Sequence, residues 1–239
     1  MGLVNAGAAP PRTRQQFVYY ALRDAIMQCE LQPGQRITTE DVARRLSVSP
    51  IPVREAFKQL QTEGLLDTIP HTGTIVAPIS RASITEVFTV MEGLELAATH
   101  VAAERVAATD VDALTTLLRK MDSALQDGEH DSWSDLNARF HQAIAHLTTM
   151  PMLEEMTARA LSHWDRVRRY FFADVLIHRM DQSQREHYAL VRAMQGHDGI
   201  EIERLVKAHN RGALAAYMEH LAAASPDESG DEQDTKTAS

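Results

Sequence analysis

Apolar side chains recur every three or four positions from residue 15 to residue 29, a spacing typical of a helix with one buried face. The pair Pro33-Gly34 ends this pattern. A second, shorter helix is expected up to Leu46, with a threonine as its N-cap. The chain therefore begins with two helices separated by a turn.

A polar turn at residues 47–49 precedes a third expected helix. Ser49 can cap this helix and Pro50 can begin it, because the first helical N–H has no partner within the helix. The helix runs to about Glu63, and Gly64 suits the left-handed position after it. Two β-prone runs with a Pro-His-Thr-Gly turn between them predict a small hairpin. These runs cover residues 65–69 and 74–76.

Beyond residue 80 the hydrophobic pattern is helical only. Polar residues, glycines and one proline separate the segments, and faces rich in alanine permit close helix packing. We expect helices at residues 82–107, 110–127, 131–148, 151–177, 182–195 and 199–223.

Charge is unevenly distributed along the chain, whose net charge is −9. Residues 1–80 carry eight Lys and Arg against seven Asp and Glu, so the acidity lies in the remainder. Five acidic residues fall in the tail at 225–239, which is too polar to fold. The single cysteine, Cys29, excludes an internal disulfide, and no apolar run suits a signal peptide or a membrane span. These features predict a cytoplasmic protein with no membrane partner.

Four blocks within residues 15–78 form a recurring pattern: Pro33-Gly34-Gln35-Arg36-Ile37, Val42-Ala43-Arg44-Arg45-Leu46-Ser47-Val48-Ser49, Pro52-Val53-Arg54-Glu55-Ala56 and Glu63-Gly64-Leu65-Leu66. This pattern resembles the GntR superfamily of bacterial transcriptional regulators. Sparser pieces follow in a matching order: Leu94-Glu95, Asn137 to His141, Glu186-His187 and His209. They resemble the ligand-binding FCD domain of the FadR-type subfamily.

The pattern and the resemblance together predict a mainly α fold. Three helices and a small β-hairpin would form an N-terminal winged helix-turn-helix, and the remaining helices an all-α antiparallel bundle of FCD type. The expected divisions are a flexible N-terminus (1–11), a DNA-binding domain (12–79), an FCD-like ligand-binding and dimerisation domain (80–224) and a disordered acidic tail (225–239).

Arg54 is the leading candidate for DNA recognition. It lies near the start of the third helix, which a helix-turn-helix places in the major groove, where a guanidinium can pair with guanine or bind a phosphate. Ser49 can bond a phosphate together with the free N–H groups of the helix start. The alternative for Arg54 is a salt bridge to Glu55 or Glu63.

The hairpin turn and the second helix supply further candidates. His71 and Gly73 can follow the adjacent minor groove, and Gly73 permits close approach of the backbone. Arg44 and Arg45 can contact phosphates. The alternatives are an ordinary turn residue for His71 and a solvated helix face for the two arginines.

Two positions depart from the GntR pattern where bases are read. Pro50 stands where the family usually has Arg, and Ile51 stands where it often has Thr. Neither side chain can donate a hydrogen bond, although both can contact a thymine methyl group. The resemblance therefore implies an operator that differs from the common one.

Asn137, His141, His187 and His209 form a candidate metal site. Asn137 and His141 are four residues apart and share a helix face. His187 and His209 lie at similar distances from the turn between the last two helices, so an antiparallel hairpin brings them to similar heights. Three imidazoles with open positions suit Zn²⁺, Ni²⁺ or a similar divalent ion. FCD domains have Asp or Asn at the position of Asn137, and Asn is the weaker metal ligand. The alternative for each histidine taken alone is an ordinary interior or surface residue.

A small carboxylate effector would need positive charge near this site. Arg166 and Arg169 can supply it, although a solvated surface is the preferred explanation for each of them. FCD domains often carry Arg four residues before the Glu of the Leu-Glu pair, and here Met91 occupies that position. Met91 would then pack or face the effector in place of an anion contact.

We therefore expect a regulator that binds an inverted-repeat operator as a homodimer and responds to a small organic acid bound at the metal. One alternative is a metal-dependent enzyme. The sequence shows no Glu or Asp at the spacing from the histidines that a general base would have. Another is a dimerisation scaffold with a structural metal. Repression and activation are both open.

Overall fold

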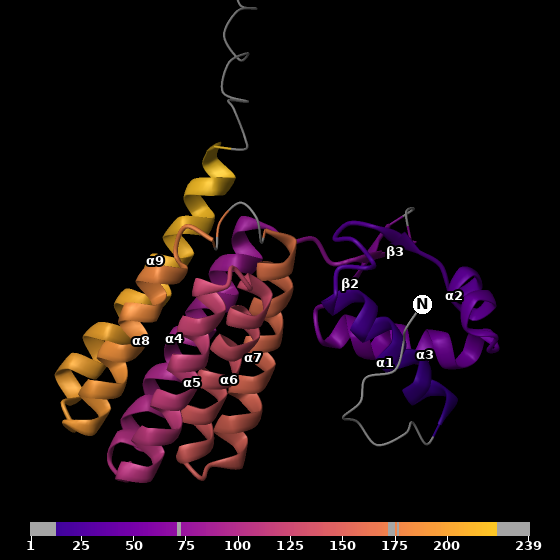
Figure 1. Cartoon of the computed structure of the whole chain (residues 1–239). Helices are drawn as coiled ribbons and strands as arrows, with labels where there is room; N and C mark the ends of the chain where they lie inside the picture. The colour runs from indigo at the N-terminus through magenta and orange to yellow at the C-terminus, as the bar shows by residue number, and fades with distance from the viewer. Residues whose placement is uncertain (1–12, 71–72, 172–174, 176, 224–239) are drawn as a thin grey trace, which may run out of the picture. The chain divides into compact units, whose positions relative to one another are not determined.

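A computed structural model describes residues 13–70, 73–171, 175 and 177–223. The structure confirms the mainly helical fold class, and the chain divides into two compact units (Figure 1). The first unit comprises residues 1–80 together with 162–170, and the second comprises the rest. His71, a candidate for DNA contact, lies outside the described residues.

Up to residue 80, the described residues of the first unit form three helices and a three-stranded antiparallel sheet of order β1-β3-β2, and the end of α7 completes the unit. The elements are α1 (Arg14–Met27), β1 (Arg36–Ile37), α2 (Thr39–Leu46), α3 (Pro50–Thr62), β2 (Leu66–Ile69) and β3 (Gly73–Val76). Leu66 pairs with Val76, and Arg36 pairs with Ile75. The predicted hairpin is therefore present, and β1 adds a strand that the sequence pattern did not indicate.

A hydrophobic core fixes α3 in this unit. One face of α3 is buried, and α1 packs against it. That face consists of Val53, Ala56, Phe57 and Leu60. The opposite side of α3 is left exposed, as a recognition helix requires.

The ends of the short helices follow from local chemistry. The Thr38 side chain accepts a hydrogen bond from the Asp41 N–H and so caps α2. Ser47 ends α2 in the left-handed region at φ 53°, and Gly64 follows α3 at φ 69°. These caps set the turn between α2 and α3 and the start of the hairpin.

The second unit is a helical bundle. Its helices are α4 (Arg81–Ala103), α5 (Ala108–Gln126), α6 (His130–Leu147), the first part of α7 (Pro151–Tyr170), α8 (Met180–Gln195) and α9 (Gly199–Ala223). Helix α4 packs against α6, α8 and α9, and α8 packs against α5 and α9. Buried residues of α4, α6, α8 and α9 therefore meet inside the bundle. In the part of the chain that the structure describes, no helix has the length and apolar character of a membrane span.

Two helices end four or more residues before their expected ends. Helix α4 ends at Ala103 rather than at residue 107, because the Asp110 carboxylate accepts a hydrogen bond from the Ala107 N–H and begins α5 there. Helix α7 ends at Tyr170 rather than at residue 177.

Candidate metal centre and DNA-binding surface

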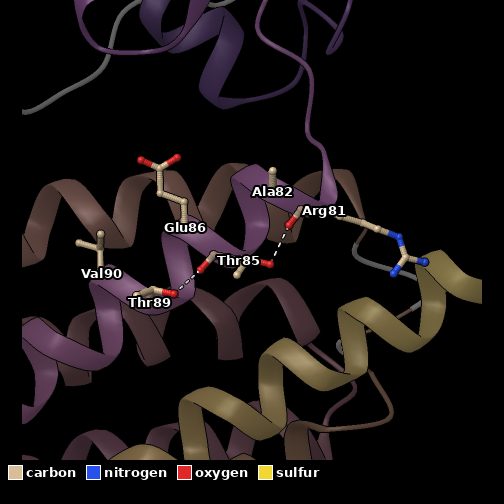
Figure 2. A pocket seen from close by; sticks show the side chains of 6 residues that line it. All are labelled: Arg81, Ala82, Thr85, Glu86, Thr89 and Val90. Atoms are coloured by element: carbon tan, nitrogen blue, oxygen red, sulfur yellow. Dashed lines mark hydrogen bonds between the residues drawn. The ribbon is translucent and has the colours of Figure 1, made fainter.

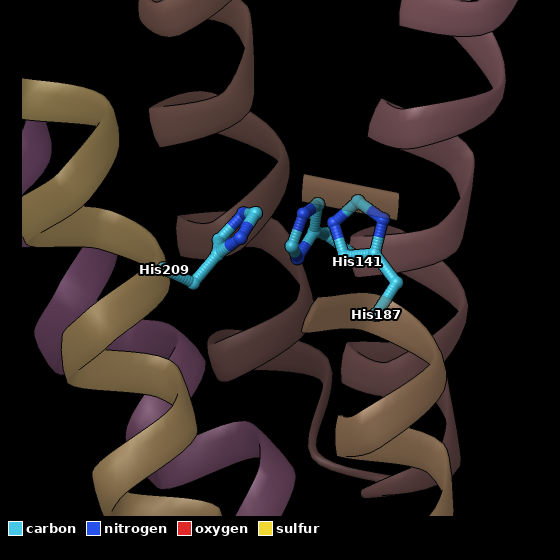
Figure 3. A group of neighbouring side chains, drawn as sticks. All are labelled: His141, His187 and His209. Atoms are coloured by element: carbon cyan, nitrogen blue, oxygen red, sulfur yellow. The ribbon is translucent and has the colours of Figure 1, made fainter. Parts of the chain in front are cut away.

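Three histidines from three helices meet inside the bundle (Figure 3). His141 comes from α6, His187 from α8 and His209 from α9. One ring nitrogen from each lies within 4.8 Å of the others, and the ring centroids are 4.8–5.4 Å apart. His141 and His187 are buried, and His209 is partly buried. The structure therefore brings together the three histidines singled out from the sequence.

Unsatisfied polar atoms at this place fit a metal ion. Both ring nitrogens of His187 and the amide oxygen of Asn137 are buried without a hydrogen-bond partner among the described residues. Leaving such groups unpaired costs about 1–3 kcal/mol each. A divalent cation bound to an imidazole nitrogen and an amide oxygen would remove part of this cost. These residues suit Zn²⁺ or Ni²⁺ by the chemistry of their donors.

Burial keeps the imidazoles in the form that binds metal. Desolvation lowers the pKa of His187 well below its usual value, and the nearby His209, His141 and Arg179 side chains lower it further. Desolvation also lowers the pKa of His141, against an opposing influence of Glu95. Both rings are therefore neutral at pH 7, and neutral imidazole is the ligand form.

Two carboxylates contact the histidines, although the sequence shows none at the spacing expected of a catalytic base. Glu95 Oε1 lies 3.2 Å from His141 Nδ1, and Glu186 Oε2 lies 2.7 Å from His209 Nδ1. Burial alone would raise the pKa of Glu186, but hydrogen bonds from His209 and Gln182 and the nearby positive charges lower it. Each contact joins different helices, so only the folded chain reveals it.

The candidate effector residues are placed in different surroundings. Met91 is buried in α4 of the second unit. Arg166 and Arg169 belong to the first unit. The Arg166 guanidinium donates to the main-chain oxygen of Ala77, and Arg169 Nε donates to an Asp165 oxygen at 2.9 Å. Both arginines thus already have partners. The three histidines belong to the second unit.

Arg54 is exposed on α3, and the carboxylates that could have paired with it are engaged elsewhere. Glu55 binds Lys58 at 3.0 Å. Glu63 accepts a hydrogen bond from Tyr19 at 2.8 Å and lies 3.6 Å from Arg23. The salt bridges considered as alternatives for Arg54 are therefore not formed.

The start of α3 has the features expected of a DNA-contacting end. Ser49 is the N-cap residue, but its side chain makes no capping hydrogen bond and stays available. Pro50 is exposed, and Ile51 is 71% exposed, which is unusual for a large apolar residue. Arg45 is exposed in α2, whereas Arg44 is paired with Asp41.

Strand β1, which pairs with β3 of the hairpin, contributes one residue that was not a candidate from the sequence, Arg36. Gly73 begins β3 with φ 95°, a conformation that favours glycine. Arg36 is exposed on β1, and its Nε lies 3.9 Å from the position that a Cβ of Gly73 would occupy. This guanidinium therefore lies beside the start of β3.

Comparison with known proteins decides the family. The FCD domain pattern matches residues 86–212, more than half of the chain, and the pattern of bacterial regulatory proteins of the gntR family matches residues 14–76. The chain belongs to the GntR family and carries an FCD domain. Regulators of this family bind operator DNA, typically as dimers.

Several characterised GntR regulators resemble this one. The HTH-type transcriptional repressor RspR of Escherichia coli K12 is 28% identical over 200 residues, which are 84% of this chain and 87% of RspR. The HTH-type regulator McbR of the same organism is 32% identical over 126 residues, 53% of this chain and 57% of McbR. These relatives are transcriptional regulators and not enzymes, so the enzyme alternative has no support.

Solved structures show the same fold. The E. coli McbR/YncC structure superposes with a TM-score of 0.68 at 23% identity, covering 87% of this chain and 99% of that one. A GntR regulator from Rhodococcus sp. RHA1 gives a TM-score of 0.66 at 22% identity, covering 88% and 98%. The chain therefore has the fold of these structures, an N-terminal helix-turn-helix and a helical FCD domain, and its family identifies it as a transcriptional regulator.

Proposed function

We propose that this regulator binds an inverted-repeat operator as a homodimer and that a divalent metal and a small organic acid in its FCD domain control the binding. The observation that carries the proposal is the convergence of His141, His187 and His209 inside the bundle of a chain that also has a DNA-binding domain. Acting on the chromosome places the protein in the cytoplasm.

The DNA half of the proposal rests on α3 and the hairpin. Arg54 would read guanine or bind a phosphate, while Ser49 and Arg45 would bind phosphates. Pro50 and Ile51 would contact thymine methyl groups, with Arg44, His71 and Gly73 at the edges of the contact. One small helix offers few contacts, so two subunits related by a two-fold axis would occupy two half-sites.

The metal half rests on donor chemistry. The three histidines and the Asn137 oxygen would hold one Zn²⁺ or Ni²⁺ ion, which leaves open coordination positions. A carboxylate is a hard oxygen donor that can complete them. Within this proposal Met91 borders the acid. Arg166 and Arg169, which already have partners, remain weaker candidates for contact with it.

Metal analysis tests this half directly. Protein purified without a histidine tag should contain one metal ion per chain, and a His187→Ala/His209→Ala variant should lose it. His146→Ala is the matched control, because His146 is exposed and pairs with Glu154 at 3.0 Å. Equal metal content in the wild type and the double variant would refute the site.

A thermal shift screen tests the effector. At fixed Zn²⁺ concentration, a binding acid raises the melting temperature by mass action. A dimerisation scaffold with a structural metal would respond to Zn²⁺ and to none of the small carboxylates. That result would replace the proposed effector site with the scaffold.

Repression is the direction of control that we propose, since the relative RspR is named a repressor. An operator–reporter fusion should be expressed more strongly in cells that lack this protein than in cells that make it. Weaker expression in its absence would identify an activator.

A further inference from the structure

The hydrogen bonds around the three histidines are unequal. His141 and His209 each have Nδ1 beside a carboxylate, whereas His187 has no hydrogen-bond partner for either nitrogen among the described residues. The ring of His187 instead packs against Phe140, with centroids 4.8 Å apart. His209 is therefore oriented by a hydrogen bond and His187 by packing, while His141 lies within 3.2 Å of a Glu95 oxygen that has no hydrogen-bond partner among the described residues.

A chain of polar contacts leads to His209. Glu186 Oε2 lies 2.7 Å from His209 Nδ1 and 3.0 Å from Arg179 Nη2. Arg179 Nη2 also lies 3.0 Å from the main-chain oxygen of His209, and Gln182 donates to Glu186 Oε1 at 2.9 Å. The Glu186 carboxylate is thus bound by Arg179 and Gln182 as well as by the His209 imidazole.

A glycine makes room for this chain. A Cβ on Gly212 would lie 2.6 Å from Arg179 Nη2, closer than real atoms approach. Gly212 lies three residues after His209 on α9, and the Arg179 guanidinium packs against the helix at this residue. An alanine there would displace the guanidinium, whose three nearest atoms are the ones that the added Cβ would meet first.

A second chain leads to His141. Glu95 is buried in α4 with Oε1 3.2 Å from His141 Nδ1, and Asn210 Nδ2 donates to its other oxygen at 2.8 Å. A carboxylate in this setting needs such donors, because burial of an unpaired charge is costly. Its orientation toward the imidazole is therefore fixed by α9 as well as by α4.

We propose that Glu95 and Glu186 are positioning residues that direct Nε2 of His141 and of His209 at the metal, with Asn210 and Arg179 holding the two carboxylates. This inference rests on the proposed metal centre. A carboxylate that accepts the Nδ1 proton fixes the tautomer, leaves the Nε2 lone pair free and makes the ring a stronger donor. Loss of such partners typically weakens metal binding 10–100-fold.

The test is a Zn²⁺ titration of the metal-free full chain in competition with a chromogenic chelator. Glu95→Ala and Glu186→Ala should each bind Zn²⁺ 10–100-fold more weakly than the wild type. Glu186→Gln should lose less than Glu186→Ala, since an amide oxygen still accepts the Nδ1 proton. A glutamine variant as weak as the alanine variant would overturn the orientation argument.

Gly212→Ala tests this set of contacts without replacing a proposed ligand or carboxylate. Its affinity should fall between those of the wild type and Glu186→Ala. Gly93→Ala is the matched control, because Gly93 lies in the middle of α4 with no atom within 4 Å of an added Cβ. Both changes raise helix propensity, so a loss confined to Gly212→Ala comes from the contact with Arg179 and not from the added methyl group as such.

The outcomes separate this inference from the metal centre itself. A wild type that binds no Zn²⁺ would overturn both. Wild-type affinity in Glu95→Ala and Glu186→Ala would overturn the inference alone. Nitrogen-15 spectra of the Zn²⁺-loaded wild type do not depend on any variant folding: coordination of His141 and His209 through Nε2 is expected, and coordination through Nδ1 would refute the proposal.

Discussion

Arg54 is an exposed cation on α3 whose neighbouring carboxylates are both engaged, Glu55 by Lys58 and Glu63 by Tyr19. A charge left free on a recognition helix is available to a base or a phosphate. Arg54→Ala should weaken operator binding by about 1–3 kcal/mol if the side chain reads a base.

Fluorescence anisotropy at one fixed salt concentration measures this effect. Arg204→Ala is the control, because it removes an exposed positive charge from α9 in the other unit. If both variants bind the operator as the wild type does, Arg54 has no part in recognition.

Ile51 gives a second prediction at this scale. The Ile51 side chain is 71% exposed on α3. Covering it with a thymine methyl group would lower the free energy of binding by about 0.8 kcal/mol for each CH₂ group that is buried. Ile51→Ala should weaken binding to the selected operator by about 1 kcal/mol. The same substitution should matter little on an operator whose thymines are replaced by uracil. A loss of equal size on both operators would rule out the methyl contact.

Residue chemistry was predictable where it depended on spacing within helices. The positions of His141, His187 and His209 follow from helical periodicity and the family resemblance, and the structure brings them together. The contacts of Glu95 and Glu186 were not predictable, because they join side chains 46 and 23 positions apart on different helices. Their one sequence signal was membership of the matched Leu-Glu and Glu-His pieces.

Among the elements, α1 and α3 are linked by Tyr19, whose hydroxyl donates to Glu63 at the end of α3. Burial, with the hydrogen bond to Glu63 and its negative charge, raises the pKa of Tyr19 to about 12. The native state therefore holds this proton more tightly than the unfolded chain, where the pKa is near 10. The resulting stability is complete below pH ~10 and is lost as the pH rises from about 10 toward 12.

Urea unfolding of the wild type and of Tyr19→Phe at several pH values checks this prediction. The stability of the wild type should fall more steeply than that of Tyr19→Phe across this alkaline range. Parallel curves would show that the link between Tyr19 and Glu63 contributes no pH dependence.

The limits of the elements were less predictable than their existence. A periodic pattern continues past Ala103, but the Asp110 carboxylate caps the Ala107 N–H and starts a new helix there. Strand β1 is two residues long, and only its pairing with β3 identifies it. A local hydrogen bond thus determines where α5 begins, and pairing with β3 determines β1; the hydrophobic pattern indicates neither.

At the scale of the whole molecule, the net charge of −9 does not prevent DNA binding. The first 80 residues are nearly neutral, and their exposed guanidinium groups include Arg36, Arg45 and Arg54. Salt screens fields beyond about 8–10 Å, so acidity elsewhere acts weakly on this surface. Local charge rather than net charge therefore determines whether operator DNA binds.

The two functions proposed for this molecule should be thermodynamically coupled. An acid that completes the metal coordination would select one packing of the bundle. If the bundle carries the dimer contact, this changes the separation of the two recognition helices, which operator DNA requires to be about one helical turn. Coupling of this kind is typically about 1–3 kcal/mol, or about 5–150-fold in affinity.

Reciprocity makes the coupling measurable from either side. Calorimetric titration of Zn²⁺-loaded protein with an identified acid should give weaker binding in the presence of operator DNA. The factor must equal the one by which the acid weakens DNA binding, because both describe one free energy. A DNA fragment of unrelated sequence is the control and should leave the affinity for the acid unchanged. Identical affinity with and without operator would mean that the FCD domain does not control DNA binding by this route.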